Sequence, residues 1–213
     1  RRQRQMCIRD RLLELTKPVA TAVVPISAGR HIYKREPSFP IAVACDPAFN
    51  FVYEANIRYL HHLGEVTYFS PLADTSLPDA GFVYLPGGYP ELYLAALSAN
   101  RQMLQSIRRY VESGGKLLAE CGGMMYLCDE IRDKNGDVYP MAGVLHQSAT
   151  MENMKLRLGY RTLLYNETRL KGHEFHYSRL VEQQNPLPSC AVAYTAKGVE
   201  TDTPVSYTHL RAH

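Results

Sequence analysis

The fold is predicted most directly from one short stretch, Lys116-Leu117-Leu118-Ala119-Glu120-Cys121-Gly122-Gly123-Met124. Its apolar beginning is typical of a buried strand, and two glycines before a helical pattern indicate a sharp turn. A cysteine at such a strand–turn–helix junction has the geometry of a nucleophile elbow. The turn presents this side chain at the carboxyl end of the sheet, where open α/β folds place their sites. The alternative is a buried core cysteine beside a tight turn.

Cys121 is therefore the candidate nucleophile. Gly122 and Gly123 tolerate the strained turn and let a substrate approach the backbone. The amino end of the following helix is expected to lower the pKa of the thiol, which would raise its thiolate fraction.

Strands and helices alternate around this stretch. The expected strands are residues 41–45, 66–69, 82–85 and 116–119, and the expected helices are residues 50–63, 101–113 and 124–131, the first capped by Asn50. This alternation predicts an α/β fold with a mainly parallel sheet and helices on both faces. Residues 154–177 instead hold strand-like stretches with few helix signals, which indicate later antiparallel strands.

A second motif, Pro86-Gly87-Gly88-Tyr89-Pro90-Glu91, follows the third expected strand. It should therefore lie at the same sheet edge as Cys121. Backbone N–H groups in such a glycine turn can serve as oxyanion donors. Taken alone, the motif is more simply an ordinary strand–loop–helix connection with Pro90 in the first helical turn.

A third motif is Gly172-His173-Glu174-Phe175-His176-Tyr177. In a strand, residues two apart share a face, so Glu174 and His176 should point one way and His173 the other. A carboxylate beside an imidazole can hold its tautomer, and a Cys–His pair suffices for acyl transfer. Each histidine alone fits a polar surface side chain better. A metal site is not expected, because no third ligand is apparent and a strand splays the two histidines apart.

The two ends of the chain, residues 1–11 and 205–213, are interpreted as translated sequencing-adapter sequence rather than native protein. Met6-Cys7-Ile8-Arg9-Asp10 can be written ATG TGT ATA AGA GAC, and the reverse complement of that string translates as Val205-Ser206-Tyr207-Thr208-His209. The alternative, a basic tail that binds nucleic acid, gives no reason for the two ends to mirror each other in codon space.

Removing these ends reverses the sign of the net charge. The whole chain carries +3, but the ends contribute six arginines and one aspartate, so 18 basic and 20 acidic residues remain, a net charge of −2. This balance predicts no nucleic-acid or anionic-membrane partner, and no apolar run approaches the roughly 20 residues of a membrane span. The remaining cysteines form no CxxC pair or zinc-ligand spacing, which predicts free thiols in a reducing cytoplasm.

Together, in this order, the three motifs resemble the hallmarks of the glutaminase domain of cobyrinic acid a,c-diamide synthases. Phe69-Ser70-Pro71-Leu72 and Leu156-Arg157-Leu158-Gly159-Tyr160-Arg161 are also similar to that family. The resemblance runs from about Ile41 to about Arg179, and it implies a class I glutamine amidotransferase-like fold. The glutaminase domain is assigned to residues 41–204, and residues 12–40 are interpreted as a linker and the end of a preceding domain.

The resemblance also implies roles for individual residues. Cys121 corresponds to the nucleophile that attacks glutamine, and His176 to its base, with Glu174 as a candidate to orient the ring. The amides in the Gly87-Gly88 turn and of Gly122 are the expected oxyanion donors and substrate-binding groups. No metal ligand and no cofactor are expected in this part of the enzyme.

The family also has an ATP-binding synthetase domain, which is expected to bind ATP, magnesium and the corrinoid. Its phosphate-binding pattern G-x-x-x-x-G-K-[ST] does not occur in this sequence. The expected partners are therefore glutamine and that N-terminal synthetase domain. Alternatives are the glutaminase half of a nickel-sirohydrochlorin a,c-diamide synthase, a non-catalytic docking module, and a cysteine peptidase-like hydrolase, which the second and third motifs disfavour.

Overall fold

The computed structural model describes residues 39–165, 167–182, 188–189 and 191–201. Contacts divide the chain into two units, Arg1–Glu36 and Pro37–His213, and every described residue belongs to the second. The predictions for both adapter-like ends and for the linker up to residue 38 lie outside the described residues.

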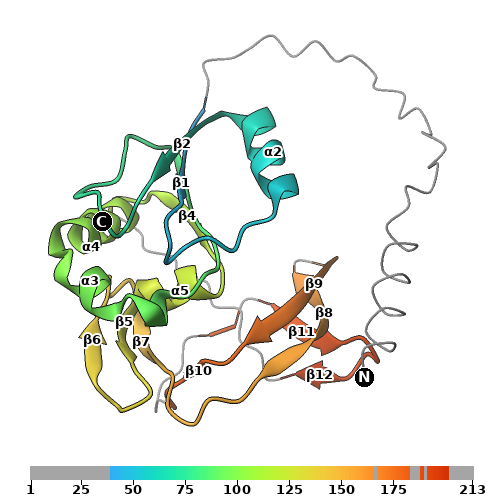
Figure 1. Cartoon of the computed structure of the whole chain (residues 1–213). Coiled ribbons are helices and arrows are strands. Elements are labelled where there is room, and N and C mark those ends of the chain that lie inside the picture. Colours follow the sequence, from blue (N-terminus) through green and yellow to red (C-terminus); the bar gives the residue numbers. More distant parts are fainter. Residues whose placement is uncertain (1–38, 166, 183–187, 190, 202–213) are drawn as a thin grey trace, which may run out of the picture. The chain divides into compact units, whose positions relative to one another are not determined.

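The first sheet carries four parallel strands in the order β2-β1-β3-β4 (Figure 1). They are β1 (Pro40–Ala44), β2 (Glu65–Phe69), β3 (Phe82–Leu85) and β4 (Lys116–Ala119). All four lie where the apolar runs predict strands, and their parallel direction brings the residues that follow β1, β3 and β4 to one edge. The α/β fold class is therefore confirmed.

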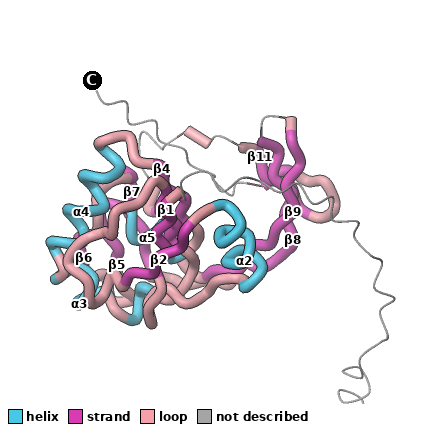
Figure 2. The backbone as a smooth tube through the Cα atoms, turned by 90° about the horizontal axis from the view of Figure 1, so that it is seen from above, coloured by secondary structure: helices cyan, strands magenta, loops and turns pink. Residues whose placement is uncertain are grey.

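Four helical segments lie between these strands in the chain, and a fifth follows β4. They are α2 (Glu54–Leu63), the 3-10 helix η1 (Pro90–Leu92), α3 (Leu94–Ala99), α4 (Arg101–Glu112) and α5 (Gly122–Leu127). The side chain of Asn100 caps α4 by accepting a hydrogen bond from the N–H of Met103 at 3.4 Å, and Gly114 with φ of 87° follows its end. Figures 1 and 2 show α2 on one side of the first sheet and α3 and α4 on the other.

The first predicted helix begins later than expected. Asn50 does not cap it, because α2 starts at Glu54 with Tyr53 in the N-cap position. The backbone before Glu54 makes other hydrogen bonds instead. The carboxylate of Asp46 accepts the N–H of Ala48 at 2.8 Å. Further along, the N–H of Phe51 donates to the carbonyl of Gly87 at 3.0 Å. These contacts hold the chain against the second motif before the helix can start.

The two faces of the first sheet bury different residues. On one face Ala42, Ala44, Val83 and Leu85 join the main core with apolar side chains of α4, α5 and the second sheet. On the other face Ile41, Val43 and Tyr84 form a smaller cluster packed against Ile57 and Leu60 of α2. The main core anchors the start of α5 and with it the turn that carries Cys121.

The second sheet has the order β10-β7-β5-β6, with β5 (Cys128–Arg132), β6 (Val138–Pro140), β7 (Leu145–Thr150) and β10 (Arg179–Leu180). The predicted helix over residues 124–131 is therefore wrong in its second half, because Cys128–Arg132 is a strand. Asp133 folds the following turn by accepting the N–H groups of Asn135 and Asp137 at 2.7 and 3.0 Å. This turn pairs β6 with β5, and the resulting ladder overrides the local helical pattern.

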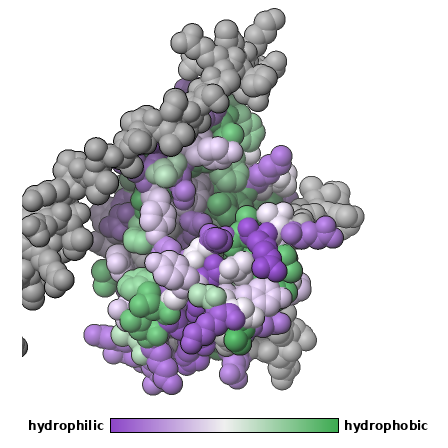
Figure 3. Space-filling view, turned by 90° about the vertical axis from the view of Figure 1, so that its right-hand side faces the viewer, coloured by the Kyte–Doolittle hydropathy of each residue, from purple (hydrophilic) through white to green (hydrophobic). Residues whose placement is uncertain are grey.

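The third sheet is antiparallel throughout, in the order β12-β11-β8-β9, as the later part of the sequence predicts. Its strands are β8 (Arg157–Tyr165), β9 (Thr168–His176), β11 (Val192–Thr195) and β12 (Glu200–Thr201). Figure 3 faces the side on which α2 and this sheet lie, where hydrophobic and hydrophilic side chains are interspersed. In the described part of the chain, no helix has the length and apolar character needed to cross a membrane.

Candidate active site

Cys121 occupies the turn between β4 and α5, as the sequence predicts. Its backbone has φ of 48° and ψ of −110°, a region that a residue with a Cβ atom adopts only under strain. The turn is this sharp because α5 packs directly on β3. A Cβ atom at Gly123 would lie 2.2 Å from the carbonyl oxygen of Leu85. Glycine at this position therefore permits the close approach that gives Cys121 its elbow geometry.

The second motif lies directly against this turn. The N–H of Tyr89 donates to the carbonyl of Ala48 at 2.9 Å, and a Cβ atom at Gly88 would lie 2.1 Å from that same oxygen. A Cβ atom at Gly122 would lie 3.1 Å from the carbonyl oxygen of Gly88. The backbone N–H groups of Gly88 and Gly122 both face the thiol of Cys121. Two amides thus converge beside the sulfur, which is the arrangement that an oxyanion hole requires.

The pKa of Cys121 is shifted in the direction opposite to the one predicted from the helix terminus. Burial in the cavity walls raises the pKa of the thiol, and the nearby carboxylates of Glu91 and Glu120 raise it further. The amides of Gly122 and Gly88 lower it, but their combined effect is smaller. The expectation of a lowered thiol pKa is therefore wrong for the protein without substrate, because desolvation and two nearby negative charges outweigh the two amides.

In the third motif, β9 places the two histidines as the strand register predicts. Glu174 and His176 share a face, and Glu174 Oε1 lies 2.8 Å from His176 Nε2. His173 instead pairs with Tyr53 just before α2, with 3.1 Å between its Nε2 and the tyrosine hydroxyl. The predicted pairing of Glu174 with His176 is present in the structure.

Both ring nitrogens of His176 have oxygen partners. Nδ1 lies 2.8 Å from the carbonyl oxygen of Ser178, and Nε2 faces the carboxylate of Glu174. A carbonyl and a carboxylate can only accept hydrogen bonds, so a neutral ring, which carries one proton, donates to one of these two oxygens at a time. Among the described residues, no hydrogen bond joins Cys121 to His176 or His173, so a proton exchange with the thiol needs one of these ring contacts to open.

Arg161 also belongs to this constellation, although the sequence reasoning gave it no role. Its Nη2 lies 2.5 Å from Glu174 Oε2, and both side chains are largely buried. Gly159, which pairs with Glu174 across the ladder, leaves the space for this contact, because a Cβ atom there would lie 2.6 Å from Arg161 Nη1. Burial raises the pKa of Glu174, but the hydrogen bond to His176 and the charge of Arg161 outweigh it and lower that pKa. Glu174 is thus held ionised against His176.

The three motifs meet in one cavity of roughly 420 Å³. Its lining residues are Phe51, Tyr53, Asn56, Gly87, Gly88, Tyr89, Glu91, Glu120, Cys121, Met125, Met151, Gly172, His173, Phe175, His176, Tyr177 and Ser178. Glu174 is buried behind the wall and does not line it. The sequence reasoning gave Glu91 no role, although this residue ends the second motif. It missed Tyr53 and Asn56, which no motif signal could place without the fold.

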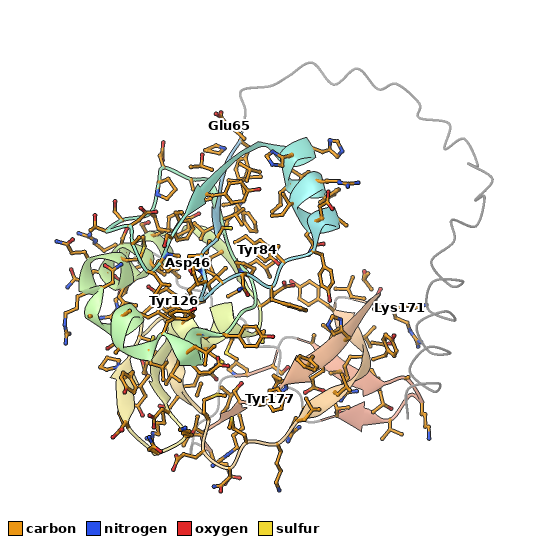
Figure 4. All side chains as sticks on the ribbon, in the orientation of Figure 1. Asp46, Glu65, Tyr84, Tyr126, Lys171 and Tyr177 are labelled. Carbon is orange, nitrogen blue, oxygen red and sulfur yellow. The ribbon has the colours of Figure 1, made fainter. Side chains whose placement is uncertain are left out.

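Glu120, next to the candidate nucleophile, is fixed by a neighbouring strand. Its carboxylate accepts a hydrogen bond from the hydroxyl of Tyr84 on β3 at 2.6 Å. Burial, together with this carboxylate, raises the pKa of Tyr84. Figure 4 shows Tyr84 within the first sheet and Tyr177 just past the end of β9, and of the two only Tyr177 lines the cavity. Within the described ranges, no group of three or more His, Cys, Asp or Glu side chains could hold a metal ion.

The fold and the elbow define an α/β protein with a cysteine at a strand–helix turn beside two convergent backbone amides, an arrangement that suits acyl transfer. Residues 40–212 match the CobB/CobQ-like glutamine amidotransferase domain, and the chain belongs to this family. A solved structure described as a glutamine amidotransferase has the same fold, with a TM-score of 0.50 and 16% sequence identity over 75% of this chain and 86% of that one.

Three relatives illustrate the similarity within the family. The hydrogenobyrinate a,c-diamide synthase of Pseudomonas aeruginosa is 43% identical over 75% of this chain and 35% of its own length. The cobyrinate a,c-diamide synthases of Fusobacterium nucleatum and Dehalococcoides mccartyi (strain 195) are 45% and 38% identical, over 66% and 87% of this chain and 33% and 42% of their own lengths. The chain therefore spans about a third to two fifths of the length of these relatives.

Proposed function

We propose that this chain is the glutaminase portion of a corrinoid a,c-diamide synthase, with Cys121 as nucleophile and His176 as general acid and base. The observation that carries the proposal is the convergence of three separate motifs on one cavity around Cys121. The family match makes glutamine the substrate that this cavity should receive.

Acylation begins when the thiol of Cys121 loses its proton to His176. The thiolate attacks the side-chain carboxamide carbon of glutamine, and the N–H groups of Gly88 and Gly122 bind the oxyanion that forms. His176 then gives its proton to the departing nitrogen, the carbon–nitrogen bond breaks, and ammonia leaves. The product on the protein is a γ-glutamyl thioester at Cys121.

In deacylation, His176 and the same two amides act on water and the thioester. His176 takes a proton from water, which attacks the thioester carbonyl, and the same two amides bind the second oxyanion. Collapse of this intermediate expels the sulfur of Cys121, which takes the proton back from His176, and glutamate is released. Glu174, held by Arg161, orients His176 and stabilises its protonated form in both halves of the reaction.

The ammonia is proposed to serve an ATP-dependent synthetase portion that uses magnesium and amidates the a and c acetate groups of the corrinoid. The support is that the relatives named as cobyrinate or hydrogenobyrinate a,c-diamide synthases extend well beyond the region this chain matches. These names favour a corrinoid over nickel-sirohydrochlorin as the amidated substrate, and they include both cobalt-containing and metal-free forms.

The test is release of ammonia and glutamate from L-glutamine by the purified chain, alone and with the synthetase portion supplied. Cys121→Ala should abolish release, while asparagine should be a poor substrate because its carboxamide is one methylene short of the thiol. In the assembled enzyme, the same variant should still amidate the corrinoid with free ammonia. Unchanged hydrolysis of glutamine by Cys121→Ala would overturn the proposal.

A further inference from the structure

Glu91 lines the cavity, but the proposed mechanism gives it no role. It lies in η1, one residue after Pro90, whose ring packs so closely on the turn after the nucleophile that a Cβ atom at Gly122 would lie 2.7 Å from Pro90 Cδ. Its carboxylate is half-buried, lines the same cavity as Cys121, and is close enough to act electrostatically on the thiol. A charge is thus held at a fixed place beside the reacting group.

This carboxylate has no cationic partner within the part of the chain that the structure describes. Burial raises the pKa of this carboxylate, and the N–H of its own backbone lowers that pKa by a smaller amount. Glu120, the other carboxylate of the cavity wall, differs because it accepts the hydroxyl of Tyr84 and is exposed. A half-buried carboxylate costs free energy unless a positive group joins it. The cavity therefore offers one uncompensated negative charge at Glu91.

We propose that Glu91 binds the α-ammonium group of glutamine and selects substrates that carry this group. The inference rests on the proposed glutaminase function. Glutamine carries its ammonium at the opposite end from the carboxamide, separated by a short flexible chain, so one end can meet Glu91 while the other meets Cys121. A charge-assisted hydrogen bond here also fixes the carboxamide against the amides of Gly88 and Gly122.

The same contact couples binding to activation of the nucleophile. In the protein without substrate, the charge of Glu91 helps to keep the thiol of Cys121 protonated. An ammonium group at Glu91 compensates this charge, so the thiolate becomes easier to form when a substrate with an α-amino group is present. Glu91 thus favours reaction of the thiol with amino acid substrates over other electrophiles.

Two electrophiles that differ by one group test the proposal on the chain itself. The first is 6-diazo-5-oxo-L-norleucine, a glutamine mimic that alkylates thiols, and the second is 6-diazo-5-oxohexanoate, which lacks the α-amino group. Peptide mass spectrometry gives the rate of Cys121 labelling by each. We expect the native chain to prefer the first compound, and Glu91→Gln to slow that reaction about 10- to 100-fold, the range that one charge-assisted hydrogen bond supports.

Labelling by the compound without the amino group should stay the same or become faster in Glu91→Gln, because the variant removes a charge that opposes the thiolate. Slower labelling by the glutamine mimic together with undiminished labelling by the compound without the amino group also shows that Glu91→Gln is folded. Glu91→Asp, which keeps the charge, should retain part of the preference, and Glu112→Gln, an exposed change on α4, should retain all of it.

An unchanged preference in Glu91→Gln would overturn the role of Glu91 and leave the glutaminase proposal intact. Equal labelling of the native chain by both compounds would also overturn it. Failure of the glutamine mimic to label Cys121 in the native chain would overturn both proposals.

Discussion

The strained backbone at Cys121 predicts an unusual order of stability between two variants. Its φ of 48° and ψ of −110° disfavour any residue with a Cβ atom. Such strain costs about 1–3 kcal/mol, and glycine relieves it, whereas the larger unfolded-state entropy of glycine costs about 0.5–1 kcal/mol. Both Cys121→Gly and Cys121→Ala lack the thiol, so their difference isolates the Cβ atom. We expect the glycine variant to be the more stable by about 1 kcal/mol.

Urea unfolding followed by circular dichroism measures this difference, with equal m-values required for both variants. In thermal unfolding, the same difference should appear as a midpoint about 2–4 °C higher for glycine. Cys45 supplies a matched control, because its φ is not positive, and there alanine should be more stable than glycine. A Cys121→Ala variant that equals or exceeds Cys121→Gly in stability would refute the strained-elbow reasoning.

The remaining predictions concern the groups around the elbow. In the assembled enzyme, His176→Ala should lower glutamine-dependent amidation by at least about 100-fold, the lower end of what a positioned acid–base group contributes. The same variant should still amidate with free ammonia. An equal loss in His173→Ala would contradict the assignment of His176 as the base. Gly88→Ala should lower the free energy of unfolding by about 1–3 kcal/mol in denaturant titrations, since its Cβ atom would meet backbone at Ala48; unchanged stability would contradict the close packing of this loop. Because burial and nearby carboxylates raise the pKa of Cys121, its labelling by iodoacetamide should increase with pH through a midpoint above that of free cysteine, and a lower midpoint would show that the amides dominate.

The parallel sheet and the elbow are predictable because local sequence determines them. Each strand of the first sheet follows a short, mostly apolar run, the pattern typical of a strand buried in a parallel sheet. The turn at Cys121 is likewise encoded locally, by an apolar strand followed by Gly122 and Gly123. The second motif also follows a strand of this sheet, so its place beside Cys121 at the same edge is predictable, and the shared cavity confirms it.

The missed features depend on contacts between distant residues. Cys128–Arg132 reads as a continuation of α5 but becomes a strand because β6 and β7 pair with it. The role of Arg161 depends on its position diagonally across a ladder from Glu174. The raised pKa of Cys121 depends first on burial of the thiol and then on the charges of Glu91 and Glu120. No pattern along the chain shows these neighbours, since each pair is brought together by the fold.

The most direct measurement of the central claim is the covalent intermediate itself. The chain is incubated with L-glutamine, quenched in acid to preserve thioesters, digested, and analysed by mass spectrometry. The account predicts a γ-glutamyl group on the peptide that contains Cys121, and neither adduct nor ammonia release in Cys121→Ala. A γ-glutamyl adduct on another cysteine, or glutamine hydrolysis that continues at its original rate in Cys121→Ala, would contradict it.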